Sequence, residues 1–547
     1  MGRPVLLTDA RSSTEDPTFI SSSADIGGVK ETHKLWNPNL DDGRYRNPIL
    51  YADYSDPDVV RVGDEFFMTA SSFNAVPALP ILHSRDLVNW RIVNHAIDEL
   101  PPAFDRPQHG NGVWAPSINY HEGEFYIFYG DPDRGVFMTT ADDPRGRWAE
   151  PTLVHEAEGW IDTAPFWDED GDAYLVHAFA KSRAGVNSVL HVAPMAPDGT
   201  HLIGESRRVF DGHDDHPTIE GPKLYERNGM YYIFAPAGGV RDGWQTVLRS
   251  DDIYGPYDDR VVLAQGETDI NGPHQGAWVE TDTGEDWFVH FQELDPYGRV
   301  VHLQPLSWDE GWPVIGHDEN GDSTGEPVRT HEKPDVSADD LPTMVPQTTD
   351  GFEAGRLGLQ WQWHGNPQFG WYSLTHRPGA LRLFPRPVAE AENLWSAPNL
   401  LLQKFPAPSF TATTQVRCEL EDGVGHGGLL VMGEEYAYLS VRQTADRTEL
   451  VHGRNTEPAD GALDTETATV PLQSSSVRLR ATVEDGGRVQ FAYATSGANS
   501  GFEPVGAPFQ ARQGRWIGAK VGLFAVRSAE AAAKTGHCDF DYFRVEE

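Results

Sequence analysis

The chain has 547 residues, enough for two to four domains, and its 39% apolar and 11% aromatic residues can form buried cores. The 43 Lys and Arg residues against 83 Asp and Glu leave a formal net charge of −40, which argues against nucleic acids and anionic membranes as partners. No window approaches the roughly 18 apolar residues of a membrane span, and residues 1–9 lack the apolar core of a signal peptide, so we expect a cytoplasmic protein, with secretion through a removed leader left open.

The basic residues are mostly arginine, because only 8 of the 43 are lysine. Ions screen the repulsion between like charges, so a surface rich in carboxylates and poor in lysine can stay folded at molar salt. One hypothesis for this composition is therefore a halophilic source organism. The other is an acidic protein encoded by a GC-rich genome.

Residues 1–40 are predicted to be an N-terminal extension, and over residues 41–316 one pattern recurs five times. A glycine turn is followed by an aromatic-rich strand in the segments 63–68, 123–128, 171–176, 229–234 and 284–289. Each copy follows a short strand and precedes an outer strand that ends in a polar turn. Short strands with regular turns, without helical periodicity between them, predict a five-bladed β-propeller.

The composition changes after residue 316. Residues 317–350 are rich in Asp, Glu, Gly, Pro, Ser and Thr, which predicts a linker or an extended strap. Apolar and polar residues then alternate in several stretches of residues 351–547, which predicts a second all-β domain, a β-sandwich. Cys418 and Cys538 lie in this domain; two cysteines cannot form a metal cage alone, and a disulfide and two buried thiols are both open.

A polar or aromatic residue lies about seven to ten residues before each glycine turn, where a blade begins its innermost strand at the channel mouth. These residues are Asp56, Trp114, Asp162, Glu220 and His274. Three converging carboxylates, without a catalytic cysteine, a phosphate loop or a serine nucleophile, favour glycoside hydrolysis or a hard-metal site. Trp114 and Phe73 offer flat apolar faces on which a sugar ring can stack, which favours glycoside hydrolysis.

Each of these residues also has a structural interpretation when it is taken alone. Asp56 and Glu220 could be turn residues, since Asp-Pro and Glu-Gly-Pro are common in turns. Aromatic residues such as Trp114 often fill blade interfaces, and His274 could be a core histidine. The shared position before the glycine turns is what favours a site. Asp58 is expected to form a hydrogen bond inside its blade.

Several ordered motifs between about residues 46 and 316 resemble one known family. They are Arg46-Asn47-Pro48-Ile49-Leu50, Ser55-Asp56-Pro57-Asp58-Val59-Val60, Gly112-Val113-Trp114-Ala115-Pro116, Ile219-Glu220-Gly221-Pro222 and Gly311-Trp312-Pro313-Val314. With these motifs the chain resembles glycoside hydrolase family 43, of the β-xylosidase and α-L-arabinofuranosidase type. The later domain resembles the concanavalin-like (jelly-roll) β-sandwich that follows the propeller in the family's xylosidases.

The resemblance implies roles for the matching residues and an inverting outcome. Asp56 would be the general base that activates water, Glu220 the general acid, and Asp162 a third carboxylate that orients the acid and raises its pKa. A negative charge at Asp162 would indeed disfavour ionisation of Glu220. Arg299 matches a substrate-binding arginine. His274 matches a channel histidine that lies near calcium or water in some members, so a structural calcium is conceivable although no cofactor is required.

The predicted function is therefore an inverting exo-glycosidase that releases a terminal pentose from an oligosaccharide, most simply xylose from β-1,4-xylo-oligosaccharides. An α-L-arabinofuranosidase acting on arabinoxylan or arabinan side chains is the alternative, because the residues around 54–55 and 71–77 depart from the usual family pattern. A non-catalytic carbohydrate-binding protein is the rival of another class. We expect the second domain to brace the propeller and to close one side of the pocket, with a carbohydrate-binding module as the alternative. The oligomeric state is left open.

Overall fold

The fold is nearly all β-structure, as a computed structural model of the chain shows. The structure describes residues 35–338, 341–389, 393–420, 425–444, 446–495, 501–529 and 536–547. Within these ranges the helical segments are short; they are α1 (Lys181–Ala184), η1 (Pro102–Asp105), η2 (Leu394–Ser396) and η3 (Pro458–Asp460). The predicted all-β class is confirmed, while most of the predicted extension 1–40 lies outside the described residues.

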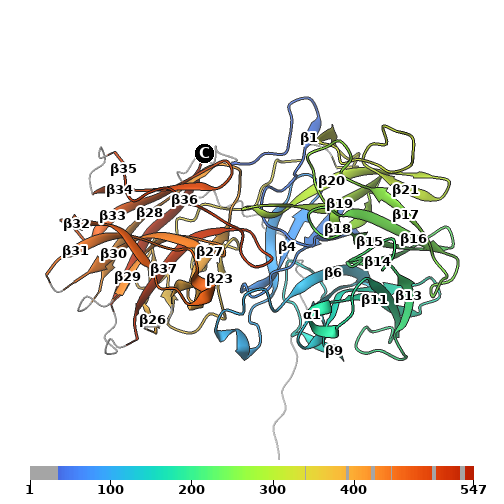
Figure 1. Cartoon of the computed structure of the whole chain (residues 1–547), viewed down its shortest axis with the longest axis horizontal. Helices are drawn as coiled ribbons and strands as arrows, with labels where there is room; N and C mark the ends of the chain where they lie inside the picture. Colours follow the sequence, from blue (N-terminus) through green and yellow to red (C-terminus); the bar gives the residue numbers. More distant parts are fainter. Residues whose placement is uncertain are drawn as a thin grey trace, which may run out of the picture. The chain divides into compact units, whose positions relative to one another are not determined.

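Five antiparallel four-stranded sheets form the blades of a β-propeller (Figure 1). Blade 1 contains β2 (Asp58–Val62), β3 (Glu65–Thr69), β4 (Ala78–Ser84) and β5 (Arg91–Ile97), and blade 2 contains β6 (Trp114–His121), β7 (Glu124–Asp131), β8 (Gly135–Ala141) and β9 (Thr152–Glu156). Blade 3 contains β10 (Trp160–Trp167), β11 (Ala173–Phe179), β12 (Val189–Met195) and β13 (Arg207–Asp211). Blade 4 contains β14 (Lys223–Arg227), β15 (Met230–Ala237), β16 (Trp244–Ser250) and β17 (Asp258–Leu263), and blade 5 contains β18 (His274–Glu280), β19 (Asp286–Leu294), β20 (Gly298–Asp309) and β21 (Trp312–Ile315). The predicted five-bladed propeller is confirmed, and each blade has one outer strand more than the repeat indicated.

The recurring glycines form the turn between the first two strands of each blade. Their φ angles lie between 63° at Gly63 and 94° at Gly123, in the left-handed region that glycine adopts without strain. A Cβ at any of the five glycines would meet open space, so the backbone conformation and not crowding selects glycine. The second strand of each blade that follows is largely buried, as in β3 and β7, because neighbouring blades cover both of its faces.

The innermost strands of the five blades line a central cavity of about 220 Å³. A buried ion pair lies in its wall, with Lys223 Nζ 3.2 Å from Asp58 Oδ2 and both side chains 5% exposed. Asp58 Oδ2 also accepts a hydrogen bond from the backbone N–H of Ile118, at 2.7 Å. The contact expected inside one blade therefore joins three blades, since these residues belong to blades 1, 2 and 4.

The segment before blade 1 closes the ring against blade 5. Leu50 and Val301 exchange two backbone hydrogen bonds. The side-chain amide of Asn47 bonds both backbone groups of Leu303, at 2.8 and 2.9 Å. The strand β1 (Arg44–Arg46) pairs with β22 (Thr330–Glu332), so part of the predicted linker or strap 317–350 pairs with the segment that closes the ring.

Two larger sheets form the C-terminal β-sandwich, which confirms the predicted second architecture. The first sheet contains β23 (Gln362–Trp363), β27 (Leu401–Lys404), β37 (Lys520–Ser528), β29 (Gly425–Met432), β30 (Tyr436–Gln443), β31 (Thr448–Asn455) and β32 (Thr465–Leu472), with β26 (Arg386–Val388) beside β37. The second sheet contains β24 (Tyr372–Ser373), β25 (Leu381–Leu383), β38 (His537–Glu546), β28 (Phe410–Glu419), β33 (Ser476–Glu484), β34 (Arg488–Thr495) and β35 (Glu503–Pro504), with β36 (Phe509–Gln510) beside β34.

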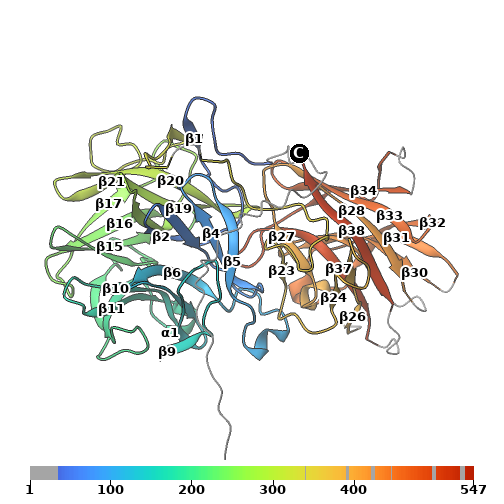
Figure 2. The same cartoon turned by 180° about the vertical axis from the view of Figure 1, so that it is seen from behind.

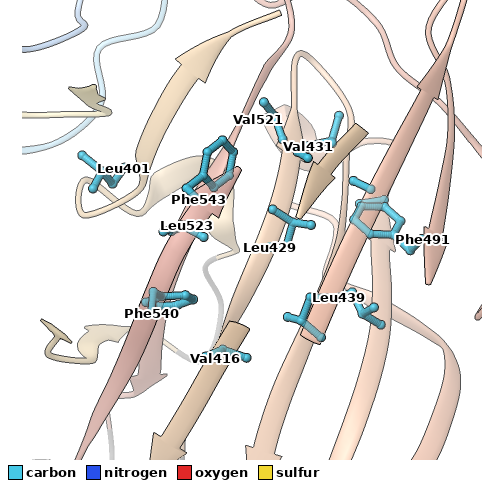
Figure 3. Close-up of a cluster of buried hydrophobic side chains, with 14 of the residues drawn as sticks. Leu401, Val416, Leu429, Val431, Leu439, Phe491, Val521, Leu523, Phe540 and Phe543 are labelled. Carbon is cyan, nitrogen blue, oxygen red and sulfur yellow. The ribbon is translucent and has the colours of Figure 1, made fainter. Parts of the chain in front are cut away.

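Side chains from both sheets form the sandwich core (Figure 3). Leu429 and Leu523 come from the first sheet and Phe540 and Phe543 from the second, and all four are fully buried. The strand β33 shows the predicted period-two pattern, because every second residue from Val477 to Val483 is buried. Cys418 and Cys538 are register partners on β28 and β38 and form a disulfide, which decides between the two states that the sequence leaves open.

The propeller and the sandwich share buried hydrogen bonds. Val76 and Trp363 form a β-bridge, and the side chain of Asn366 accepts from the backbone N–H of Leu100 at 2.9 Å. The Tyr297 hydroxyl, at the tip of the β19–β20 hairpin, donates to the carbonyl of Pro408 at 2.6 Å. The strands β23 and β27, which Figure 2 shows next to each other, are part of this boundary through Trp363 and Lys404. Separation of the domains would therefore leave buried polar groups without partners.

Candidate active site

One residue in a left-handed conformation lies within two residues of the start of each innermost strand. These residues are Asp56 (φ 54°), Ala115 (φ 30°), Asp162 (φ 56°), Gly221 (φ 60°) and Gln275 (φ 35°). In blades 2, 3 and 5 the residue lies at an irregularity in the strand pairing, and such bulges change the direction of a side chain. Left-handed non-glycine residues are strained, and such strain is concentrated at functional sites.

The left-handed residues show that the five sequence-predicted positions are not equivalent. Asp56 and Asp162 occupy the left-handed position itself. Trp114, Glu220 and His274 come one residue earlier in their blades. Counting back from the glycine turns could not detect this offset, because the spacing from the left-handed residue to the glycine itself varies between seven residues in blade 1 and nine in blades 3 and 5.

Asp56 is buried and receives three side-chain hydrogen bonds. Its Oδ2 accepts from the hydroxyls of Ser55 and Ser71, both at 2.6 Å, and its Oδ1 accepts from Arg299 Nη1 at 3.0 Å. Ser71 Oγ also accepts from the backbone N–H of Ala115 at 2.7 Å, which ties blade 1 to the start of blade 2. The carboxylate is therefore held in one orientation by groups from blades 1 and 5 and by the loop after β3.

Asp162 and Glu220 lie near each other, so that the charge of Asp162 acts on Glu220. Asp162 Oδ2 accepts from the backbone N–H of Gly221, the neighbour of Glu220, at 2.8 Å. Burial, followed by the negative charge of Asp56, raises the pKa of Asp162 to about 6. Burial, followed by the negative charge of Asp162, raises the pKa of Glu220 to about 8, although 32% of the Glu220 side chain is exposed. At neutral pH Glu220 is thus a protonated carboxylic acid that reaches solvent.

His274 lies against this pair. Its Nε2 is 3.5 Å from Glu220 Oε1, and only 1% of the side chain is exposed. Burial, with a smaller contribution from Arg299, lowers the pKa of His274 to about 3, so the imidazole is neutral at neutral pH. Neither ring nitrogen has a hydrogen-bond partner among the residues that the structure describes.

The two predicted aromatic residues contact each other edge to face. The ring centroids of Phe73 and Trp114 are 6.3 Å apart, and Trp114 Nε1 donates to the carbonyl of Gly110 at 2.9 Å. Trp114 is partly exposed, whereas Phe73 is 3% exposed and presents little free surface. The structure therefore brings all seven predicted residues into one connected group, with Phe73 mostly covered.

The sandwich contributes a residue that the sequence analysis did not identify. Trp516 is 46% exposed, and its ring centroid lies 5.9 Å from the guanidinium carbon of Arg299. Its loop contacts the loop of Gly110, where a Cβ would meet the side chains of Arg515 and Trp516. No repeat or motif marks Trp516, and only the folded chain brings it beside the propeller.

No group of three or more His, Cys, Asp or Glu residues in the described part of the chain is arranged to hold a metal ion. Likewise, no helix within the described ranges is long and apolar enough to cross a membrane.

A protonated carboxylic acid and a hydrogen-bonded carboxylate at the mouth of a propeller channel, bordered by tryptophan, are typical of a glycoside hydrolase. Comparison with known proteins gives the same class. Residues 45–313 match the model of glycosyl hydrolases family 43, and residues 349–546 match the concanavalin A-like C-terminal domain of β-xylosidases. The chain belongs to glycosyl hydrolase family 43 and is an enzyme of this hydrolase class.

Several relatives match over most of the chain. A protein of Xylanibacter ruminicola is 40% identical over 88% of this chain and 86% of its own. A β-xylosidase of Formosa agariphila is 32% identical over 92% of this chain and 90% of its own. A non-reducing end α-L-arabinofuranosidase of Bacteroides ovatus is 28% identical, over 93% and 96%. The crystal structure of a xylan β-1,4-xylosidase from Bacillus halodurans matches with a TM-score of 0.79 and 26% identity, over 92% of this chain and 100% of that one.

Proposed function

We propose that the chain is an inverting exo-glycosidase that releases xylose from the non-reducing end of β-1,4-xylo-oligosaccharides. The observation that carries the proposal is the difference between two carboxyl groups of one site. Asp56 accepts three hydrogen bonds, whereas the pKa of Glu220 is raised to about 8 by burial and by Asp162. Such a pair provides a proton acceptor and a proton donor at the same pH.

In this mechanism Glu220 protonates the departing glycosidic oxygen while Asp56 takes a proton from the attacking water. Water attacks the anomeric carbon from the face opposite the leaving group, so the configuration inverts. Asp162 keeps Glu220 protonated by its negative charge and fixes the backbone beside it through the Gly221 N–H. Arg299 orients Asp56 and donates to a sugar hydroxyl, and neutral His274 contacts Glu220.

Aromatic side chains border the sugar. Trp114 offers the partly exposed face, and Phe73 supports it from behind by an edge contact. Trp516, beside Arg299, is on the side that the sandwich provides. Because the sandwich occupies this side, we infer that the site receives a chain end more readily than the middle of a polymer, which supports exo action.

An α-L-arabinofuranosidase is the second candidate, because a relative that matches 93% of this chain has that activity in its name. A non-catalytic sugar-binding protein would not need one carboxyl group that accepts a proton and another that donates one.

The structural calcium near His274 stays a prediction. Calcium prefers oxygen ligands, so the two unpaired ring nitrogens of His274 support a bound water better than calcium. The domain limits 41–316, 317–350 and 351–547 and a cytoplasmic location also stay predictions.

The test compares two leaving groups. Xylobiose needs protonation of its leaving oxygen, whereas p-nitrophenolate leaves without help. We expect Glu220→Gln to lower kcat/KM for xylobiose by about 10²–10⁴-fold and for p-nitrophenyl β-D-xyloside by much less. Asp56→Asn should lower both, and proton NMR of the first product should show α-xylose. Equal losses of kcat/KM for both substrates in Glu220→Gln would contradict the assignment of Glu220 as the general acid. Faster turnover of p-nitrophenyl α-L-arabinofuranoside than of p-nitrophenyl β-D-xyloside by the wild type would contradict the assignment of xylose as the released sugar.

A further inference from the structure

Two buried lysines of the sandwich face each other on neighbouring strands. Lys404 ends β27, Lys520 begins β37, and the two are register partners. Lys520 is 6% exposed and the Lys404 side chain 15% exposed. Like charges directly opposite each other destabilise a sheet, and burial adds the loss of hydration. In the described part of the sandwich, no carboxylate lies within ion-pair distance of either lysine.

The compensating carboxylate belongs to the propeller. Asp53 is 2% exposed, and its Oδ2 lies 3.9 Å from Lys404 Nζ. Burial and the charge of Lys404 lower the pKa of Lys520 to about 7, while Asp53 acts in the opposite direction. One carboxylate therefore faces two lysines across the boundary between the domains.

The other oxygen of Asp53 holds the turn that precedes Arg299. Asp53 Oδ1 accepts from the backbone N–H of Arg299 at 2.9 Å. Gly298, at φ 80°, has no room for a side chain, because a Cβ there would collide with Asp53 Oδ1 and with the backbone nitrogen of Gly518 in the sandwich. The Asp53 carboxylate thus lies between Lys404 and the backbone of the β19–β20 hairpin.

This hairpin sets where the Arg299 guanidinium lies. Arg299 Nη1 donates to Asp56 Oδ1 at 3.0 Å and to Ser55 Oγ at 2.7 Å, and the Arg299 carbonyl accepts from the N–H of Tyr54 at 3.1 Å. Segment 53–56 and Arg299 are therefore joined at several points. From the sandwich side Lys404 contacts Asp53, and Lys520 interacts with Asp53 through its charge. Displacement of a catalytic contact by about 1 Å can lower a rate by about 10²-fold.

We propose that Asp53, Lys404 and Lys520 form an interdomain positioning cluster that holds Arg299 on Asp56. None of the three is assigned a contact with substrate, so they are positioning residues and not catalytic ones. The sandwich then acts in the reaction through the geometry of Arg299. This inference rests on the roles given to Asp56 and Arg299 in the proposed function.

The test measures kcat/KM for p-nitrophenyl β-D-xyloside per folded enzyme, in the full-length chain. Asp53→Asn keeps the acceptor for the Arg299 N–H but removes the charge, and Lys404→Met removes the facing ammonium. We expect each to lower kcat/KM by about tenfold or more, and Lys404→Arg to retain most of it. In an Arg299→Ala background, Asp53→Asn should cause little further loss, because there is no guanidinium left to position.

The matched control is Glu449→Gln in the sandwich. Glu449 is 3% exposed and lies 3.0 Å from Arg442, so this change also removes a buried charge pair, but one without a propeller residue. It should lower the thermal midpoint and leave kcat/KM per folded enzyme unchanged. The proposed positioning cluster is wrong if Asp53→Asn and Lys404→Met, like this control, leave kcat/KM per folded enzyme unchanged. It is also wrong if Asp53→Asn lowers kcat/KM by the same factor with and without Arg299→Ala. Unchanged activity in Asp56→Asn and Arg299→Ala would instead overturn the proposed function.

Discussion

The carboxyl groups of the site differ because of what each one touches. Asp56 accepts hydrogen bonds from two hydroxyls and a guanidinium. For Glu220, burial and the nearby charge of Asp162 favour the protonated form. Two residues of similar chemistry can therefore take opposite parts in proton transfer, and the environment assigns them.

The pH dependence of activity should follow the Glu220 proton. Since burial and Asp162 raise the pKa of Glu220 to about 8, kcat/KM for xylobiose should fall as the pH rises through this value, because ionised Glu220 has no proton to donate. Asp162→Asn removes the negative charge that helps to raise this pKa, so the basic limb should move to lower pH. Rate profiles between about pH 5 and pH 10 measure this.

The control for this prediction is Asp215→Asn, which removes an exposed carboxylate of the same propeller. Its profile should coincide with that of the wild type. A basic limb that stays in place in Asp162→Asn, or that moves to higher pH, would show that the charge of Asp162 does not act on Glu220.

At the scale of elements, the innermost strands do two things. The candidate site residues lie around the starts of these strands. Asp58, Ile118 and Lys223, two to four residues further along the chain, join the blades around the cavity. The Asp58–Lys223 pair, with the Ile118 N–H, connects blades 1, 2 and 4 directly beneath the carboxylates. A buried pair of this kind is strongly destabilising only when one partner is lost.

Asp58→Asn should therefore destabilise the propeller by about 3–5 kcal/mol, because it leaves the Lys223 ammonium buried without its counter-ion. The double variant Asp58→Asn with Lys223→Met should be more stable than the single one, because the uncompensated charge is gone. Urea unfolding would measure both. Asp42→Asn, which removes the exposed partner of Arg44, should leave the midpoint unchanged. A double variant less stable than Asp58→Asn would contradict this account.

At the scale of the whole molecule, the sandwich is part of the enzyme's architecture. It pairs with the propeller backbone at Val76, supports the β19–β20 hairpin through Pro408, and places Trp516 beside Arg299. These contacts lie on the same side as the proposed positioning cluster. They favour a bracing role over an independent carbohydrate-binding module.

Truncation after Ile315 tests the bracing role. The fragment would expose buried backbone groups at Val76 and Leu100, so we expect poor solubility and loss of turnover. Activity on p-nitrophenyl β-D-xyloside and size-exclusion chromatography would show both effects. A soluble and fully active fragment would contradict the bracing role.

The net charge of −40 gives a second prediction for the whole molecule. If repulsion among surface carboxylates limits stability, the thermal midpoint should rise between about 0.1 M and molar salt, because ions shorten the range of this repulsion. The increase should level off once the charges are screened. A thermal midpoint that does not depend on salt would count against the hypothesis of a halophilic source.

The sequence by itself determined the five blades, the sandwich and the three carboxylates. Glycine turns followed by aromatic strands recur in each blade, and period-two alternation recurs in strands of the sandwich. Both are local patterns, so they can be recognised without knowledge of tertiary contacts. It did not determine the one-residue offset of Trp114, Glu220 and His274, the disulfide between Cys418 and Cys538, or the fourth strand of each blade. The domain limits and the roles of individual site residues stay predictions.

Only the tertiary structure decided which distant residues meet. Trp516 lies beside Arg299, and Lys404 beside Asp53, across several hundred residues of chain, and no local pattern records such contacts. The raised pKa of Glu220 likewise depends on burial and on Asp162, which belongs to another blade. Charge, burial and orientation are properties of the folded surroundings, so the sequence alone does not decide whether a particular carboxyl group holds a proton.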